Sequence, residues 1–134
     1  MINRPIASFV GLFGYISNAT IRNLGVEADK MLGGLYGITG GKSVGGLIGR
    51  AESSIIENCY TVGGVKGSTV SGVRSAVGGL VGEVGEHSLI RNCYSTCSVS
   101  GGNYIGGLAG VNMGNIQTSY ASGTITATES FVGG

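Results

Sequence analysis

The chain has little of what most enzymes and nucleic-acid-binding proteins need. Among its 134 residues there is one histidine, one proline and no tryptophan, and only 11% of the residues are charged. A formal net charge of +1 argues against a nucleic acid or an anionic membrane surface as a partner, because both require a concentrated basic patch. No apolar run approaches the roughly 18–20 residues of a membrane-spanning helix. We therefore expect neither a nucleic-acid partner nor a membrane span.

What the chain does contain is glycine together with many apolar residues. It has 28 glycines, yet 42% of its residues are hydrophobic. Disordered chains combine low hydrophobicity with high net charge, and this chain has neither property. Because its length suits one domain, we expect residues 1–134 to form a single folded unit with a buried core.

The glycines recur in a repeated motif, which decides the predicted architecture. The motif reads VGGLIG at Val44–Gly49, VGGLVG at Val77–Gly82 and IGGLAG at Ile105–Gly110, and a degenerate copy, FVGLFG, occupies Phe9–Gly14. Each motif leucine is followed eight to ten residues later by an isoleucine. The predicted units are residues 9–43, 44–76, 77–104 and 105–131, with a partial fifth unit at 132–134. Similar units with insertions confined to a few points are typical of stacked repeats.

Each unit is predicted to be extended rather than helical. Its segments are three to six residues long and rich in Val, Ile, Thr and Tyr, with Gly, Asn and Ser between them. Three short strands in each unit make one coil, so we expect an all-β, right-handed parallel β-helix (β-solenoid) of about four coils, spaced about 4.8 Å apart. Equivalent side chains then stack in columns. The inward columns are Leu47, Leu80 and Leu108; Ile21, Ile56, Ile90 and Ile116; and Val65, Val99 and Ile125, while Asn23, Asn58 and Asn92 share a corner.

The repeated residues resemble the GLUG repeat. The pattern of that family runs Gly-Gly-Leu-x-Gly, then Ile-x-Asn-Cys-Tyr, then Val, as in Val77–Gly82, Ile90–Tyr94 and Val99 here. The resemblance covers roughly residues 9 to 134. GLUG repeats occur in large bacterial surface and secreted proteins, including adhesin-like chains and the non-catalytic parts of IgA-specific metallo-endopeptidases. The resemblance therefore implies an extracellular or cell-surface scaffold and no enzymatic activity.

The three cysteines fall into two classes. Cys59 and Cys93 are equivalent repeat positions, so we expect them to be small buried thiols in one core column. Side chains in register point the same way, which is poor geometry for a disulfide. Cys97 stands where the neighbouring units have Gly63 and Gly123, and it is predicted to be an exposed thiol at a turn.

No catalytic, cofactor-binding or metal-binding residues are expected. His87 has Glu83, Glu86 and Arg91 nearby, but there is no second histidine or buried carboxylate pair to support catalysis. We interpret this segment as a solvated corner. The stretch GGKS at Gly40–Ser43 is similar to the end of a phosphate-binding loop, but it leads into a predicted strand rather than a helix, which argues against a nucleotide site.

The two ends of the sequence carry the same motif, because Phe131 and Val132 repeat Phe9 and Val10. Solenoids expose raw strand edges unless these are capped. Two explanations stay open. Flanking repeats of a longer chain cover the edges, or copies of this chain associate head to tail through Phe9, Val10, Phe131 and Val132.

The predicted function is that of a non-enzymatic extracellular structural module. It serves as a surface-protein stalk, an adhesive segment for a host or glycan surface, or a self-assembling fibre subunit. The alternative is a carbohydrate-binding or carbohydrate-cleaving β-helix. That alternative requires Tyr60, Tyr94 and Tyr120 to form a solvent-facing aromatic stripe, and their burial would exclude sugar binding.

Overall fold

All regular structure in the described part of the chain is β-strand. The computed structural model describes residues 2–4, 8–28, 37–70, 74–127 and 131–133, with residues 2–4, 28 and 131–133 described by their backbone alone. These segments contain 21 short strands and no helix, and the strands pair in parallel. The predicted all-β class is confirmed.

The strands form five faces, which the chain visits in the same order in each coil. Face I consists of β1 (Ile2–Arg4), β6 (Ile38–Gly40), the second part of β10 (Tyr60–Lys66), β15 (Ser98–Gly101) and β20 (Ile125–Ala127). Face II consists of β2 (Phe9–Val10), β7 (Ser43–Gly45), β11 (Ala76–Gly78), β16 (Tyr104–Gly106) and β21 (Phe131–Gly133). Face III consists of β3 (Phe13–Ser17), β8 (Ile48–Glu52), β12 (Val81–Val84) and β17 (Ala109–Asn112). Face IV consists of β4 (Thr20–Arg22), β9 (Ile55–Glu57), β13 (Leu89–Arg91) and β18 (Asn115–Gln117). Face V consists of β5 (Gly25–Ala28), the first part of β10, β14 (Tyr94–Ser95) and β19 (Tyr120–Ala121).

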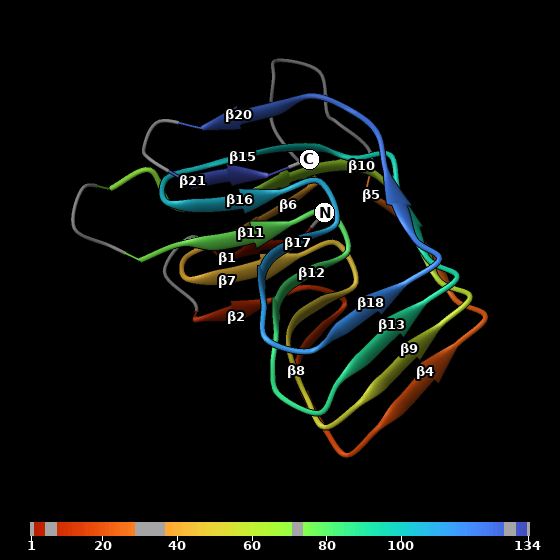
Figure 1. Ribbon diagram of the computed structural model, residues 1–134. Coiled ribbons are helices and arrows are strands. Elements are labelled where there is room, and N and C mark those ends of the chain that lie inside the picture. Colours follow the sequence, from red (N-terminus) through yellow and green to blue (C-terminus); the bar gives the residue numbers. More distant parts are fainter. Residues whose placement is uncertain (1, 5–7, 29–36, 71–73, 128–130, 134) are drawn as a thin grey trace.

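One passage through faces I to V is one coil. The first coil is β1 to β5, the second β6 to the first part of β10, the third the rest of β10 to β14, and the fourth β15 to β19. β20 and β21 begin a fifth coil on faces I and II. Figure 1 shows the stacking most clearly on face IV, where β4, β9, β13 and β18 lie side by side in chain order.

Equivalent residues stack in register from coil to coil. Val77 pairs with Val44 on one side and with Ile105 on the other. The predicted parallel solenoid is therefore confirmed. Two details differ from the prediction. Each coil contains five short strands rather than three, because it bends at more corners, and in the first coil Val10 rather than Phe9 pairs with Val44.

Two of the corners are made by residues with left-handed backbone conformation. Between faces IV and V, Asn23, Asn58 and Asn92 have φ values of 56°, 52° and 52°. Asparagine adopts this conformation more readily than most other residues. The Nδ2 of Asn58 donates to the Oδ1 of Asn23 at 3.2 Å, so amides stack along the axis as predicted. Between faces III and IV, Ser53 and His87 serve the same purpose with φ values of 44° and 59°.

The coils bury two separate apolar clusters. The larger cluster lies among faces III, IV and V, and the smaller one lies between faces I and II. Fully buried members of the larger cluster include Leu47, Leu80, Ile56 and Ile90, and those of the smaller include Val44, Val65 and Val77. Between the clusters the Thr61 hydroxyl donates to the carbonyl oxygen of Gly79 at 2.7 Å. Each coil is therefore narrow in the middle and wider on both sides.

Candidate functional site

The strands at both ends of the stack leave apolar columns open. β3, β4 and β5 pair only with the second coil, and β17, β18 and β19 pair only with the third, within the part of the chain that the structure describes. Ile56 and Ile90, in the middle of the isoleucine column, are 0% exposed. Ile21 and Ile116, at the two ends of the same column, are only partly buried.

The first-coil edge carries the larger apolar side chains. Leu12 is 49% exposed and Phe13 is 38% exposed, whereas Leu47 and Ile48 in the second coil are 0% exposed. Phe13 pairs with Ile48, so Phe13 occupies a core position that nothing covers on its outer side among the described residues. We call the strands β3, β4 and β5 the first edge, and β17, β18 and β19 the last edge.

The residues predicted for self-association lie on face II. Phe9 is 42% exposed, and its ring lies 5.6 Å from that of Tyr15. Val10 is 2% exposed and belongs to the smaller apolar cluster. Phe131 and Val132 form β21 and pair with β16, but their side chains lie outside the described residues. Their role in association stays a prediction.

Tyr60, Tyr94 and Tyr120 form a ladder of stacked rings on face V. Successive ring centroids lie 5.2 Å apart, with interplanar angles of 8° and 6°. Parallel rings at this distance are offset, so each ring covers only part of the next. Tyr60 lies over Gly25, where any side chain would collide with the tyrosine ring. Tyr60 and Tyr94 are half-buried and Tyr120 is 60% exposed, so the ladder reaches solvent.

A buried ion cluster lies in the angle between faces II and III. The neighbours of Ser43 and Glu83 in sequence, Val44 and Val84, point into the two apolar clusters, so Ser43 and Glu83 point outward. Glu83 is nevertheless only 2% exposed. Its Oε1 accepts a hydrogen bond from Ser43 Oγ at 2.7 Å.

Two arginines complete the cluster. Arg74 Nη1 donates to Glu83 Oε1 at 2.6 Å, and Arg50 Nη1 donates to Glu83 Oε2 at 2.9 Å. Burial by itself raises the pKa of Glu83, but the hydrogen bonds from Ser43 and Arg74 and the charges of both arginines outweigh it, so this pKa lies below its ordinary value. Arg50 also pairs with Glu52, whose hydrogen bond raises the pKa of Arg50.

The cluster is balanced in charge, because two arginines face two glutamates. It joins faces II and III to the segment that precedes β11, and the Arg74 guanidinium also lies 5.2 Å from the Tyr104 ring centroid. In the sequence Glu83 lies close to His87, and the residues around them do not predict this cluster. The missed signal is that Arg50 and Glu83 each follow the last glycine of a motif, which puts opposite charges in one column.

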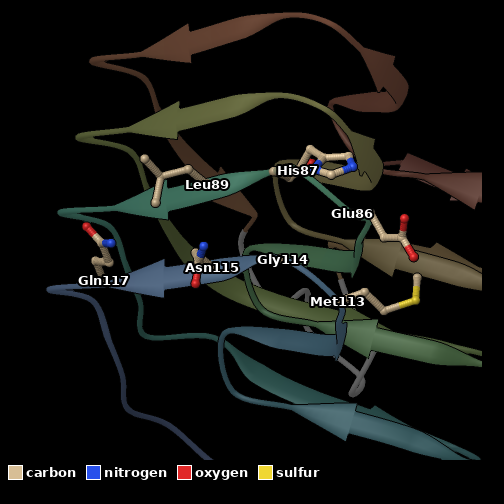
Figure 2. Close-up of a pocket in the computed structure, with 8 residues that line it drawn as sticks. Glu86, His87, Leu89, Met113, Gly114, Asn115 and Gln117 are labelled. Atoms are coloured by element: carbon tan, nitrogen blue, oxygen red, sulfur yellow. The ribbon is translucent and has the colours of Figure 1, made fainter.

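A shallow depression lies where the third and fourth coils turn from face III to face IV (Figure 2). Four residues, Gly85–Ser88, separate β12 from β13, but only two separate β17 from β18. The unequal corner lengths create the depression. Figure 2 shows Glu86 and Met113 on one side and Leu89 and Gln117 on the other, so the side chains spread apart rather than converge. This arrangement does not provide an acid–base pair.

Cys59 and Cys93 occupy the predicted core column. Both are free thiols and 1% exposed. Each sulfur donates to the carbonyl oxygen two residues earlier, at 3.3 Å for Cys59 and Glu57 and at 3.2 Å for Cys93 and Arg91. The two thiols therefore have the same orientation. Hydrogen bonding to Cys59, together with burial, raises the pKa of the Cys93 thiol.

The prediction that Cys97 is exposed is wrong. Its side chain is 1% exposed, packs in the smaller apolar cluster, and lies 3.7 Å from the carbonyl oxygen of Gly79. The equivalent residues Gly63 and Gly123 have φ values of 122° and 120°, which L side chains rarely adopt. Cys97 does not have a positive φ, so its corner follows a different path and its side chain turns into the core.

The described residues contain no group of three His, Cys, Asp or Glu side chains placed to hold a metal ion. Within the same residues, no helix is long and apolar enough to cross a membrane.

Comparison with known families identifies the repeat. The model of the GLUG motif matches residues 40–74, 73–100 and 101–126, which together span more than half of the chain. The chain belongs to the GLUG family. Each matched GLUG unit covers faces II to V of one coil, the second, third or fourth, and continues onto face I of the next coil. No curated protein and no solved structure matches the chain.

The glycines of the GLUG motif are required by close packing, as the third unit shows. A Cβ on Gly78 would collide with the carbonyl oxygen of Val81 in the same turn. A Cβ on Gly79 would collide with the Ser95 side chain across the narrow middle of the coil. A Cβ on Gly82 would come within 2.6 Å of the backbone of the preceding coil. The GLUG motif is therefore a packing element that lets three pieces of backbone approach one another.

Proposed function

We propose that this chain is a non-enzymatic structural segment of a larger surface or secreted protein, in which further coils continue the stack at both edges. The observation that carries the proposal is the isoleucine column. Its middle members, Ile56 and Ile90, are fully buried, while Ile21 and Ile116 at its ends are left partly open. GLUG units are repeat modules of surface or secreted proteins, which supports the location.

The geometry suits a spacer of adjustable length. Each coil contacts only its neighbours, so stability is the sum of local coil energies and coil–coil interfaces. Each added coil lengthens the stack by about 4.8 Å, the spacing of hydrogen-bonded strands. Because equivalent residues such as Val77 and Ile105 pair in register, a further coil with the same motif meets a surface already shaped for it.

The polar residues support the non-enzymatic part of the proposal. Glu83, the buried carboxylate of the ion cluster, accepts hydrogen bonds from three donors and is only 2% exposed. His87 lies exposed at a corner of the shallow depression. The hydroxyl that donates to Glu83, that of Ser43, belongs to a residue that is itself only 1% exposed, so a substrate has no access to this pair for general acid–base chemistry.

A coil-duplication experiment tests the proposal. Val77 pairs with Ile105, so residues 77–104 are one complete coil, and a second copy of this segment is inserted directly after Tyr104. We expect a folded protein with a higher Tm, lengthened by about 4.8 Å in small-angle X-ray scattering. The matched control carries Gly79→Ala in the inserted copy alone. If the duplicated coil lowers Tm as much as the control does, the proposal is wrong.

Carbohydrate binding is a second candidate function, favoured by the tyrosine ladder. Tyr120 is 60% exposed, and aromatic rings at a protein surface give sugars an apolar contact. A glycan array with Tyr120→Ala tests this candidate, with Tyr15→Ala as the control because Tyr15 is 52% exposed but lies away from the ladder. Binding that is lost only with Tyr120→Ala supports it. The absence of any glycan signal, or an equal loss in both variants, contradicts it.

A further inference from the structure

We propose that the last edge of one molecule binds the first edge of a second copy of the same chain, head to tail. The last edge consists of β17, β18 and β19, and the first edge of β3, β4 and β5. The inference rests on the proposed function, because it names a partner for the same open edges. The inference goes further than the proposed function, because it states that a second, separate molecule of this chain covers the open edge.

The interface continues one that the chain already forms three times. On face IV the order β4, β9, β13 and β18 is built from three identical parallel pairings, in which Ile21, Ile56, Ile90 and Ile116 follow one another. Placing a second copy on β18 adds a fourth pairing of the same kind, with Ile21 of the second copy next to Ile116. Unpaired parallel strands are templates for such addition.

The side chains of the two edges are complementary in size. Following the register through the four coils, Phe13 at the first edge corresponds to Ala109 at the last edge. In the same way Val26 corresponds to Ala121. At these two positions a larger side chain of one copy therefore meets a smaller side chain of the other, while Ile21 meets Ile116 as in the pairings within the chain. Such pairing fills the core without overpacking.

At the tyrosine ladder the sizes are reversed. Tyr120 carries the exposed end of the ladder, and the residue of the second copy that would lie next to it is Gly25. Gly25 has no side chain to collide with the tyrosine ring. The contact is also free of charge repulsion on face IV. Arg22 of the second copy would follow Gln117 rather than Arg91, which keeps the arginines apart.

Faces I and II each require an exchange between the two copies. When β3 of the second copy lies beside β17, its β1 and β2 would have to lie beside β15 and β16, where β20 and β21 of the first copy already pair. On face II, residues 9–11 and 131–133 are both Phe-Val-Gly, so the two strands present the same sequence. We include in the proposal that β20 and β21 of the first copy replace β1 and β2 of the second copy. The association is therefore expected to be slow, because two native strands must first detach.

This geometry does not close on itself. The two edges are different surfaces, so the contact is heterologous, and repeated contacts generate an open rod. Analytical ultracentrifugation and electron microscopy of the purified chain are expected to show species that lengthen with concentration. Folded protein that remains monomeric at high concentration would overturn the inference.

Substitutions at the last edge test the site. Ile116→Lys places a charge in the proposed interface at a position that is only partly buried in the single molecule. Asn115→Lys, on the same strand but at an exposed position, places the same charge on the outer surface of face IV rather than in the core column of the interface. We expect Ile116→Lys to abolish the larger species and Asn115→Lys to retain them, with both variants folded by circular dichroism. Equal behaviour of the two variants contradicts the inference.

A mixing experiment tests the head-to-tail direction. Ile116→Lys blocks the last edge and Ile21→Lys blocks the first edge, so each variant alone should be monomeric. Mixed in equal amounts, they retain one open edge of each kind and should form dimers but nothing longer. A mixture that stays monomeric overturns the inference. If the coil-duplication variant is folded and longer in that case, the proposed spacer function stands and only the second copy is wrong.

Discussion

The hydroxyl of Thr61 donates a hydrogen bond to the carbonyl oxygen of Gly79 across the interior of the solenoid, over 2.7 Å. Thr61 belongs to face V, and Gly79 lies in the turn between faces II and III. The contact separates the two apolar clusters. Thr61 also limits the second glycine of the preceding GLUG motif, because a Cβ on Gly46 would come within 2.9 Å of the Thr61 methyl group.

Replacing Thr61 by Val keeps the shape of the side chain and removes the hydroxyl. The buried Gly79 carbonyl then loses a donor, so we expect the free energy of unfolding to fall by about 1–2 kcal/mol. Urea denaturation measures this change. The control is Thr96→Val at an exposed position, which should leave the midpoint nearly unchanged. Equal effects of the two substitutions would contradict a role for the hydrogen bond.

Replacing Gly79 by Ala tests the packing role of the motif. The added Cβ would collide with the Ser95 side chain and with the backbone carbonyl oxygen of Gly107, which cannot move away cheaply. We expect a loss of about 3 kcal/mol or more, or failure to fold. In Gly101→Ala, by contrast, the Cβ comes no closer than 3.0 Å to a Val77 methyl group. This control should cost much less in the same thermal unfolding assay.

The buried ion cluster makes stability depend on acid. The pKa of Glu83 is lowered in the folded protein, so its contribution is fully present above the ordinary value of 4.5 and is lost as the pH falls through the lower folded pKa. Glu83→Gln should cost about 1–2 kcal/mol at pH 7, because both ion pairs of Glu83 are lost, while Arg50 keeps Glu52 and the Arg74 side chain is 52% exposed. The difference in Tm between wild type and variant should shrink below pH 4.5. A constant difference across this range would mean that the charge of Glu83 contributes nothing.

The asparagine corner separates backbone conformation from side-chain hydrogen bonding. Asn58 has a φ of 52° and donates to Asn23. Asn58→Ala introduces a residue that disfavours the left-handed backbone conformation, and it also removes the side-chain amide. We expect the free energy of unfolding to fall by about 1–2 kcal/mol. Asn58→Gly removes the amide but still adopts the left-handed conformation easily, so the free energy of unfolding should fall by less. Chemical denaturation of both variants checks the order, and a more costly glycine would show that the amide ladder dominates.

The burial of all three cysteines predicts slow thiol chemistry. Cys59, Cys93 and Cys97 are each 1% exposed, so a thiol-reactive dye should label the native protein slowly and the urea-unfolded protein three times per chain. Labelling followed by mass spectrometry identifies the sites. Rapid modification of Cys97 in the native state would restore the sequence-based expectation that it is exposed.

The repeat predicted most of the fold because each coil solves the same packing problem with the same residues. The stacked positions of Leu80, Ile90 and Val99 follow from spacing alone. When coils stack in register, equivalent side chains point to the same side of the coil, and apolar ones therefore all point into the core. Five strands in each coil were not predicted, because the corner at Ser53 carries no glycine or proline to mark it, and Gly85 in the corner at His87 has no glycine equivalent in the second coil. Cys97 was misplaced for a related reason, as its corner departs from the glycine corners beside it.

The sequence by itself determined the periodicity, the parallel stacking and the identity of the inward columns, because these depend only on which residues recur and at what distance. Only the tertiary structure decided that the interior of each coil is divided into two apolar clusters. The narrow middle at Thr61 and Gly79 and the ion cluster of Glu83, Arg50 and Arg74 arise from contacts between different faces and coils. Their geometry depends on the angle at each corner, which a pattern of spacings along one chain does not contain.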